Sequence, residues 1–426
     1  MKKHSLARSL LSSLLIMLFL STGLVSFAQH KENVTLKFPV WNPATLEILK
    51  ELNIPAEYKK VQPNVTIEFE LFKEVDYENT MKIRNAANEL PDILPLQAKW
   101  LENFKDSLLP LNDLQATKAN LFATDYAING TIVGLPESMF NEFVWYRKSI
   151  FNEYNIAIPK TWGEFIEAAK KIKKGNKYIP ICMGGKDAWP DYPFNEFMPA
   201  LVANNGSLWN VMATQDGPFS KDQPFYKAYA QIMDLYNAKV MGPDPLGVSW
   251  DQAKMLFGSG KGAMLASGQW FIADLESMTN GDLSDIGAFF LPVRGKETEP
   301  FNVISMVENF YCIPRNSRHI EEVKDFYNWW FSKDIYVKRM TKYKMASTLK
   351  GITIDIGPIF KEAYKEPDLN FVVFMEGNED YNKIMNAIKF DVKALGQEMM
   401  AGKNLNQMMN DLNKKWKNAR SRLGIK

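Results

Sequence analysis

The chain has 426 residues, 46% of them hydrophobic, and its 51 lysines and arginines nearly balance its 49 aspartates and glutamates. This balance excludes the polybasic surface that is typical of proteins that bind nucleic acid or anionic membranes. The length exceeds what one hydrophobic core supports, so we expect a globular protein with two lobes.

The first 28 residues have the pattern of a secretory signal peptide. Lys2, Lys3 and Arg8 precede an apolar run from Leu10 to Leu20, and small residues stand three and one positions before a cleavage site after Ala28. Cleavage would leave 398 residues (426 − 28) with 48 basic (51 − 3) and 49 acidic side chains, a net charge of −1. The segment holds no cysteine to accept a lipid, so we expect a freely diffusing periplasmic or secreted protein. An uncleaved membrane anchor is the alternative.

Strands and helices alternate from the start of the mature chain. Apolar alternation predicts strands at 34–38 and 65–71, and a short strand at 91–94. Helical patterns lie between them, one reaching about Lys60 and one over 76–89. This alternation predicts a largely parallel α/β sheet with helices on both faces.

The stretch from Gly134 to Lys174 carries the clearest local signals. An apolar strand runs to Lys148, and Thr161 with Glu164 forms a capping box at the start of a helix. The helix has one apolar face, made of Trp162, Phe165, Ile166, Ala169 and Ile172.

Later segments continue the pattern without an internal repeat or a long flexible linker. We expect a helix over 225–237, a second capping box at Ser249 and Gln252 opening a helix that ends at Gly258, a buried strand at 262–265, and helices over 321–331 and 404–420. Two lobes without a tether should be built from interleaved segments of the chain.

The ordered motifs resemble the substrate-binding proteins of ABC importers, in particular the large family that binds sugars. The resemblance rests on Gly134-Leu135-Pro136, Trp145-Tyr146-Arg147-Lys148, Pro159 to Phe165, Phe257 to Trp270, Gly287 to Pro292 and Ile313 to Trp330. It implies a two-lobe periplasmic-binding-protein type II fold with the ligand cleft between the lobes. It also implies an N-terminal lobe of 29–136 and 289–346, a C-terminal lobe of 137–288 and 347–426, and a monomer.

Three tryptophans are expected in the cleft because ligands of α/β sheets bind beyond the carboxyl ends of strands. Trp41, Trp189 and Trp270 stand beside turn-forming residues, and the resemblance places them where flat rings would stack on a sugar. Trp162, Trp329, Trp330 and Trp416 lie on helix faces and are expected in the core. Trp250 is a possible further wall of the cleft, although its place at a helix start favours packing.

The resemblance also indicates polar and apolar partners for the ligand, with ordinary solvated loop side chains as the alternative. These residues are Asn42, Gln97, Lys99, Glu137, Phe140, Asp191, Glu308 and Asn309. The pair Glu308-Asn309 departs from the small, often glycine-containing pair usual in the family, which leaves the identity of the sugar open.

Other chemistry finds little support in the sequence. Cys182 and Cys312 lie in apolar contexts and are expected as buried free thiols in different lobes, and three histidines are too few for a zinc cluster or a convincing catalytic triad. The glycines around Lys261 lack the spacing of a phosphate-binding loop. We therefore expect no metal, no cofactor and no catalytic residue.

The functional hypothesis is a protein that closes its lobes around a mono- or oligosaccharide and delivers it to the membrane permease subunits of an ABC importer. Two alternatives remain at this stage. The same fold could bind a polyamine, a phosphorylated polyol or a metal chelate, and a secreted glycoside hydrolase would need only two suitably placed carboxylates.

Overall fold

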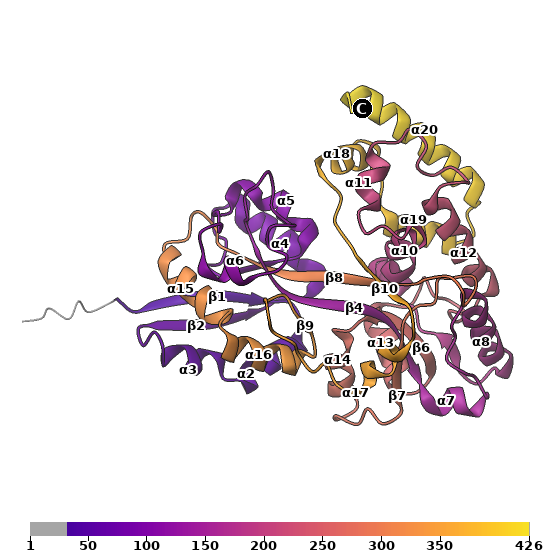
Figure 1. Ribbon diagram of the computed structural model, residues 1–426, viewed down its shortest axis with the longest axis horizontal. Coiled ribbons are helices and arrows are strands. Elements are labelled where there is room, and N and C mark those ends of the chain that lie inside the picture. The colour runs from indigo at the N-terminus through magenta and orange to yellow at the C-terminus, as the bar shows by residue number, and fades with distance from the viewer. Residues whose placement is uncertain (1–31, 426) are drawn as a thin grey trace, which may run out of the picture.

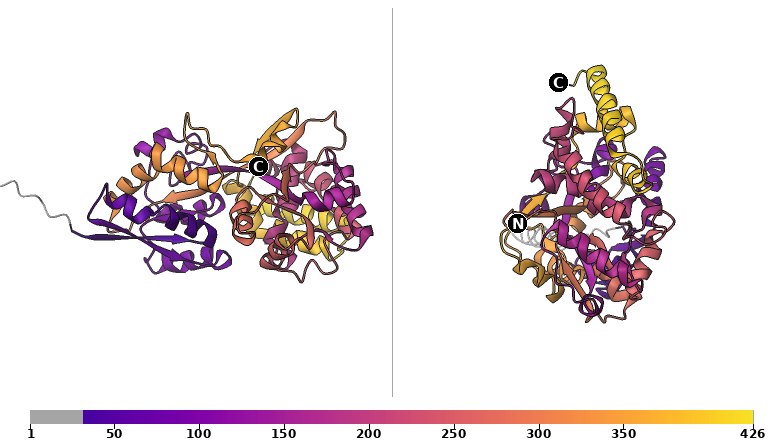
Figure 2. Two further views of the ribbon diagram at one scale, coloured as in Figure 1. Left: turned by 90° about the horizontal axis from the view of Figure 1, so that it is seen from below. Right: turned by 90° about the vertical axis from the view of Figure 1, so that its right-hand side faces the viewer.

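The computed structural model describes residues 32–425, which fold into two lobes joined by extended strands (Figure 1). The predicted signal peptide lies outside the described residues. The view turned by 90° shows the lobes side by side with a narrower region between them (Figure 2). Helices surround the sheet strands in both lobes, as the mixed α/β pattern of the sequence predicts.

The N-terminal lobe is built on the parallel pair β1 and β2. The register runs from Val34 opposite Val65 to Val40 opposite Leu71. Its core contains Phe38, Tyr58 and Trp330, all nearly or fully buried. Its elements are β1 (Val34–Val40), α2 (Pro43–Glu51), α3 (Ile54–Lys59), β2 (Val65–Leu71), α4 (Glu74–Ala86), β3 (Leu94–Leu96), α5 (Leu101–Phe104), α6 (Gln115–Ala119), α15 (Ile320–Trp330) and α16 (Lys333–Tyr343).

The C-terminal lobe holds most of the helices. Phe165, Tyr229 and Trp416 are fully buried in its core. Its elements are α7 (Lys148–Glu153), α8 (Trp162–Gly175), β5 (Ile179–Ile181), α9 (Tyr192–Asn195), α10 (Phe197–Ala203), α11 (Leu208–Ala213), α12 (Pro224–Ala238), α13 (Trp250–Gly258), β6 (Gly262–Gly268), α14 (Phe271–Met278), β7 (Ile286–Phe289), α17 (Pro358–Lys361), β10 (Leu369–Val373), α18 (Glu379–Ile388), α19 (Val392–Met400) and α20 (Leu405–Leu423).

Two long strands cross between the lobes. β4 (Leu135–Arg147) pairs with β8 (Phe301–Cys312) in the N-terminal lobe and with β6 in the C-terminal lobe. The start of β8 pairs with β10. The two-residue strand β9 (Ala346–Ser347) also pairs with β4, and the chain returns to the C-terminal lobe after it.

The expectation of a largely parallel sheet is wrong for this central part. β4 is antiparallel to β6, β7, β8 and β9, whereas β1–β2, β5–β6 and β8–β10 are parallel. Helices separate most strands in sequence, but the two crossing strands run in opposite directions because the chain leaves the N-terminal lobe on one and returns on the other.

The packing places the crossings later than the lobe limits expected from the sequence. Phe289 and Leu291 pack in the C-terminal core, although the expected N-terminal segment began at 289. Leu349 and Ile354 pack in the N-terminal core, although that segment was expected to end at 346. The crossings on β4 and β8 lie inside continuous strands, so no turn signal marks them in the sequence, whereas the third crossing lies in the irregular segment after β9.

The capping signals are confirmed in large part. Ser249 and Gln252 form a complete capping box at α13. At α8 the Thr161 hydroxyl accepts from the Glu164 N–H at 3.3 Å, but the Glu164 carboxylate accepts from the N–H of Lys160, one residue before the cap, at 2.7 Å. The local geometry shifts the second bond by one residue, and the helix still begins where it was expected.

Candidate functional site

A cleft opens between the lobes where β4 and β8 cross. It holds about 1360 Å³ of space, part of which is open solvent. Residues that follow β1 and β3 line one wall, α9, α10 and α14 contribute to the opposite wall, and β4 and β8 form the floor. This location obeys the rule that α/β sheets bind ligands beyond the carboxyl ends of their strands.

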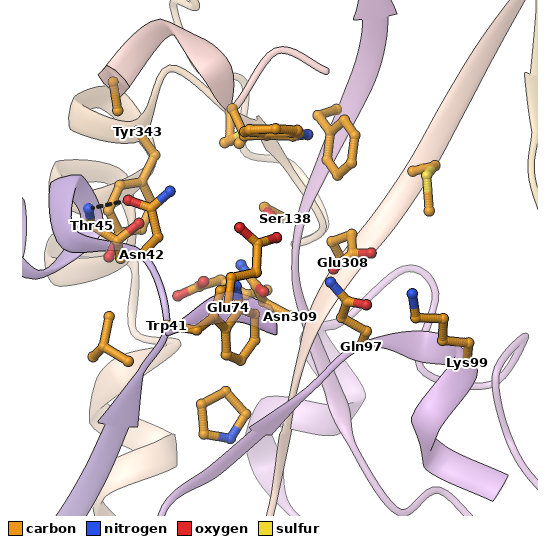
Figure 3. A pocket seen from close by; sticks show the side chains of 18 of the residues that line it. Trp41, Asn42, Thr45, Glu74, Gln97, Lys99, Ser138, Glu308, Asn309 and Tyr343 are labelled. Atoms are coloured by element: carbon orange, nitrogen blue, oxygen red, sulfur yellow. Dashed lines mark hydrogen bonds between the residues drawn. The ribbon is translucent and has the colours of Figure 1, made fainter. Parts of the chain in front are cut away.

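The N-terminal wall presents Trp41 and Asn42, directly after β1 (Figure 3). The Trp41 ring packs against Tyr77 and Trp100, with centroid distances of 4.6 and 6.1 Å, which fixes the orientation of the half-buried indole. The Asn42 Oδ1 accepts from the Thr45 N–H at 3.1 Å and caps α2. The capping bond orients the side chain, and its amide nitrogen is a donor that a ligand hydroxyl could accept from.

The C-terminal wall presents a cluster of aromatic rings. Trp189 lies 5.0 Å from Trp250 and 6.2 Å from Trp270, measured between ring centroids, and Trp250 lies 5.8 Å from Trp270. Trp189 and Trp270 line the cleft, whereas Trp250 is buried behind them at the start of α13. Tyr192 joins this wall, and its hydroxyl donates to the buried Glu142 carboxylate at 2.8 Å.

A group of charged side chains from both lobes faces the same cleft. Glu308 lies on β8, Lys99 follows β3, and Glu196, Glu376 and Lys393 come from the C-terminal lobe. Lys393 Nζ lies 3.7 Å from the Glu196 carboxylate.

Burial governs the titration of this group. Burial raises the pKa of Glu308 to about 7, against the opposing charge of Lys99. Burial, and then repulsion from Glu196, raise the pKa of Glu376 to about 8. Burial lowers the pKa of Lys99, and the nearby ammonium of Lys393 lowers it further.

The structure brings together ten of the eleven residues singled out in the sequence. The exception is Asp191, which is 1% exposed and lies in the C-terminal core. Its carboxylate accepts from Asn195 and from the Tyr236 hydroxyl, and burial raises its pKa to about 7. The prediction for Asp191 is wrong because the short helical turn after Trp189 points the carboxylate inward. The ten that line the cleft are Trp41, Asn42, Gln97, Lys99, Glu137, Phe140, Trp189, Trp270, Glu308 and Asn309.

Glu137 borders the cleft, but its charge is used within the protein. Its carboxylate pairs with the fully buried guanidinium of Arg339 and accepts from Trp330 Nε1 at 3.1 Å. The pair ties β4 to α15 and α16, so Glu137 holds the crossing strand in place. A direct contact of Glu137 with ligand remains only a prediction.

The backbone conformation of Asn309 bears on the unusual pair Glu308-Asn309 on β8. Its φ is +59°, in the left-handed region that favours glycine and that asparagine tolerates better than most residues. The backbone at this position is therefore one that glycine would also adopt without strain. The asparagine adds a polar side chain to the floor of the cleft (Figure 3).

Sequence reasoning missed other residues of the cleft. Glu74 opens α4 three residues after β2, so the strand-end rule applied to Trp41 could have found it. Tyr192 and Glu196 follow Trp189 closely. Glu376 and Lys393 carry no local signal, because only the packing of the C-terminal lobe brings them to the cleft.

The lobes also touch outside the crossing strands. Lys344 Nζ, after α16, lies 2.5 Å from the carboxylate of Glu276 on α14. Beyond the cleft, the Tyr126 hydroxyl of the N-terminal lobe donates to the Phe374 carbonyl of the C-terminal lobe at 3.1 Å. These contacts hold the lobes in the relative position that shapes the cleft.

Three further features of the described part of the chain concern metal ligands, membrane spans and thiols. Within residues 32–425, no group of three or more His, Cys, Asp or Glu side chains is placed to hold a metal ion. No helix in that range combines the length and apolar character needed to cross a membrane. Cys182 and Cys312 are buried free thiols in different lobes, as expected.

A family model and several curated proteins are similar to this chain in sequence. The family model described as bacterial extracellular solute-binding protein matches residues 43–336. An uncharacterised ABC transporter extracellular-binding protein of Pyrococcus horikoshii is 23% identical, with 78% of this chain and 77% of the relative covered. The multiple sugar-binding protein of Streptococcus mutans is 21% identical, with 68% and 71% covered.

Solved structures share the fold. A mannobiose-bound ABC transporter binding protein from Bifidobacterium animalis subsp. lactis aligns with a TM-score of 0.76 at 17% identity, covering 91% of this chain and 95% of that one. The raffinose-bound binding protein RafE aligns with a TM-score of 0.73 at 18% identity, covering 91% and 99%. The type II periplasmic-binding-protein fold is thereby confirmed.

Proposed function

Because the chain belongs to the bacterial extracellular solute-binding protein family, we propose that it captures a mono- or oligosaccharide between its lobes. It would then deliver the sugar to the permease subunits of an ABC importer. The protein would act outside the cytoplasm as a monomer.

The observation that carries this proposal is the presence of indole rings on both walls of one cleft. Trp41 comes from the N-terminal lobe, and Trp189 and Trp270 come from the C-terminal lobe. Flat rings offer large rigid contact areas to the apolar faces of pyranoses, and the surrounding amides and carboxylates can hold hydroxyl groups. The printed names of the relatives, which include sugar-binding proteins, support the same ligand class.

The proposed mechanism is closure of the lobes about the crossing strands. A ligand that stacks on Trp41 and Trp270 together gains both contacts only when the lobes are close. It therefore shifts the open–closed population by its differential affinity for the two states. Hinge closure of this kind is the behaviour expected of periplasmic binding proteins, and the permease would recognise the closed form. No bond in the ligand is made or broken.

A polyamine is the second candidate, and one observation favours it. Carboxylates and aromatic rings line the cleft together, which is the combination that binds extended cations. The three indoles favour a sugar, because an aliphatic chain would leave much of their area without contact.

The test is a thermal-shift screen of the protein without its predicted signal peptide, using mono- and oligosaccharides, uronates, polyols and polyamines, with product analysis of each hit. A ligand that binds the folded state raises the melting temperature. Stabilisation by a sugar that is recovered intact would support the proposal. A cleaved sugar would indicate a glycoside hydrolase, and stabilisation by polyamines alone would replace the ligand class.

A further inference from the structure

The cleft carries more negative than positive groups. Five glutamates and two lysines line it, and one of the glutamates, Glu137, is already paired with Arg339. Among the lining side chains, four carboxyl groups therefore face two ammonium groups. A neutral sugar would leave this imbalance in place when the lobes close over it.

The carboxylates lie on both sides of the cleft. Glu308 and Glu376 share a cluster with Glu196, in which Lys99 comes from one lobe and Lys393 from the other. Lys393 is already engaged with Glu196, at 3.7 Å. Of these two lysines, Lys99 exerts the stronger attraction on both Glu308 and Glu376.

Glu74 is a further acidic group, on the N-terminal wall. Its side chain projects into the cleft from the start of α4, near Trp41 and Asn309 (Figure 3). Its charged neighbours are Lys254, Asp274, Lys99 and Asp251. Lys254 is itself paired, at 3.1 Å from Asp251 and 3.7 Å from Asp274. The acidic character therefore extends along the cleft and is not confined to one corner.

Burial without enough counter-charge is costly for ionised carboxylates. It raises the pKa of Glu308 to about 7 and that of Glu376 to about 8, so both carboxyls hold a proton for part of the time near neutral pH. A ligand cation placed among them would favour their ionised forms and release those protons. A neutral ligand has no such effect.

We propose that the cleft selects an oligosaccharide carrying a protonated amino group, with the indoles stacking on its rings and the glutamates receiving its ammonium group. This inference rests on the proposed function and specifies its ligand class. The three indoles favour an amino sugar over a linear polyamine, because sugar rings cover more of their area than an aliphatic chain does. Indole faces also attract cations directly.

The test compares sugars that differ only at one substituent. The β-1,4 dimers of glucosamine, glucose and N-acetylglucosamine carry an ammonium, a hydroxyl and a neutral amide at the same position. The pairs galactosamine and galactose, and mannosamine and mannose, vary the ring. Calorimetric titration near pH 6.5, below the typical amino pKa of ~7.7–8.0, keeps the amines charged. Two buffers with different ionisation enthalpies report the protons released.

We expect at least one amino sugar to bind about tenfold or more tightly than its matched hydroxyl and amide sugars, as hydrogen bonds to charged groups allow. Its binding should release protons and weaken with added salt. Glu308→Gln and Glu376→Gln should each reduce the preference for the amine and the proton release, and should change the affinity for neutral sugars less. Glu379→Gln on the outer helix α18, which removes an exposed pair with Lys383, is the matched control and should change neither.

The outcomes separate this inference from the proposed function. Equal or tighter binding of neutral sugars would overturn the inference and leave the sugar-binding function standing. An amine preference that both glutamine variants retain would also overturn it. Stabilisation by spermidine alone, or by no sugar of either kind, would overturn the inference and the proposed function together.

Discussion

The buried pair of Glu137 and Arg339 is predicted to hold the crossing strand β4 against the N-terminal lobe. Arg339 is fully buried, donates to the Trp330 carbonyl at 2.7 Å and places its guanidinium 3.4 Å from the Trp330 ring centroid. The substitution Arg339→Met replaces the guanidinium side chain with an unbranched apolar one and removes the charge. Glu137 would then retain the Trp330 Nε1 donor at 3.1 Å and the Tyr311 hydroxyl, but no counter-charge.

The cost follows from the geometry. Removing one partner of a buried pair leaves the other charge without compensation, which costs about 3–5 kcal/mol of unfolding free energy. Urea unfolding followed by tryptophan fluorescence measures this loss. The double substitution Glu137→Gln with Arg339→Met removes both charges and should be less destabilised than the sum of the single variants, by about 1–3 kcal/mol.

Two results would refute this reasoning. A loss of unfolding free energy below about 1 kcal/mol for Arg339→Met would show that the pair contributes no more than an exposed ion pair does. If the losses of unfolding free energy in the two single variants added up to the loss in the double variant, the two side chains would act independently. Because Ser138, the next residue on β4, lines the cleft, the surviving variants should also be tested for ligand affinity.

Three further predictions concern the cleft and the lobes. Trp270→Ala should weaken binding of the sugar by about 2–4 kcal/mol in calorimetry, the range for a well-buried anchor. Trp329→Ala, on α15, should leave affinity unchanged; equal losses in both variants would contradict the assignment of Trp270. Burial raises the folded-state pKa of Glu376 to about 8 from its ordinary 4.5, so the folded protein holds this proton more tightly than the unfolded chain. Its contribution to stability is fully present below pH 4.5 and is lost as pH rises through about 8. In urea unfolding, the free energy of unfolding of Glu376→Gln should therefore decline less steeply with rising pH than that of the unaltered protein. An equal pH dependence in both proteins would contradict this. Lys344→Met removes the contact with Glu276 between the lobes and should raise the radius of gyration of the ligand-free protein in small-angle scattering. The free energy of the open state relative to the closed state should fall by at most about 1 kcal/mol, since the pair is partly exposed. A smaller radius of gyration in the variant would contradict this prediction.

Local sequence signals predicted the elements well because each depends on neighbouring residues. The alternating residues 34–38 form most of β1. The hydroxyl of Ser249 caps α13, as its spacing from Gln252 predicts. The strand-end rule and the family resemblance together placed Trp41 and Gln97 at the cleft. The helix expected to reach Lys60 divides into α2 and α3, because Asn53 adopts a left-handed conformation between them.

The sequence by itself determined the class of fold, most helices and the indoles that border the cleft, since periodicity, caps and ordered motifs are local properties of the chain. Only the tertiary structure decided that β4 and β8 cross antiparallel, that Asp191 turns into the core, and that Glu376 and Lys393 meet Lys99. These outcomes depend on which distant segments pack together. That choice is made by the burial of two whole cores, and no short stretch of sequence encodes it.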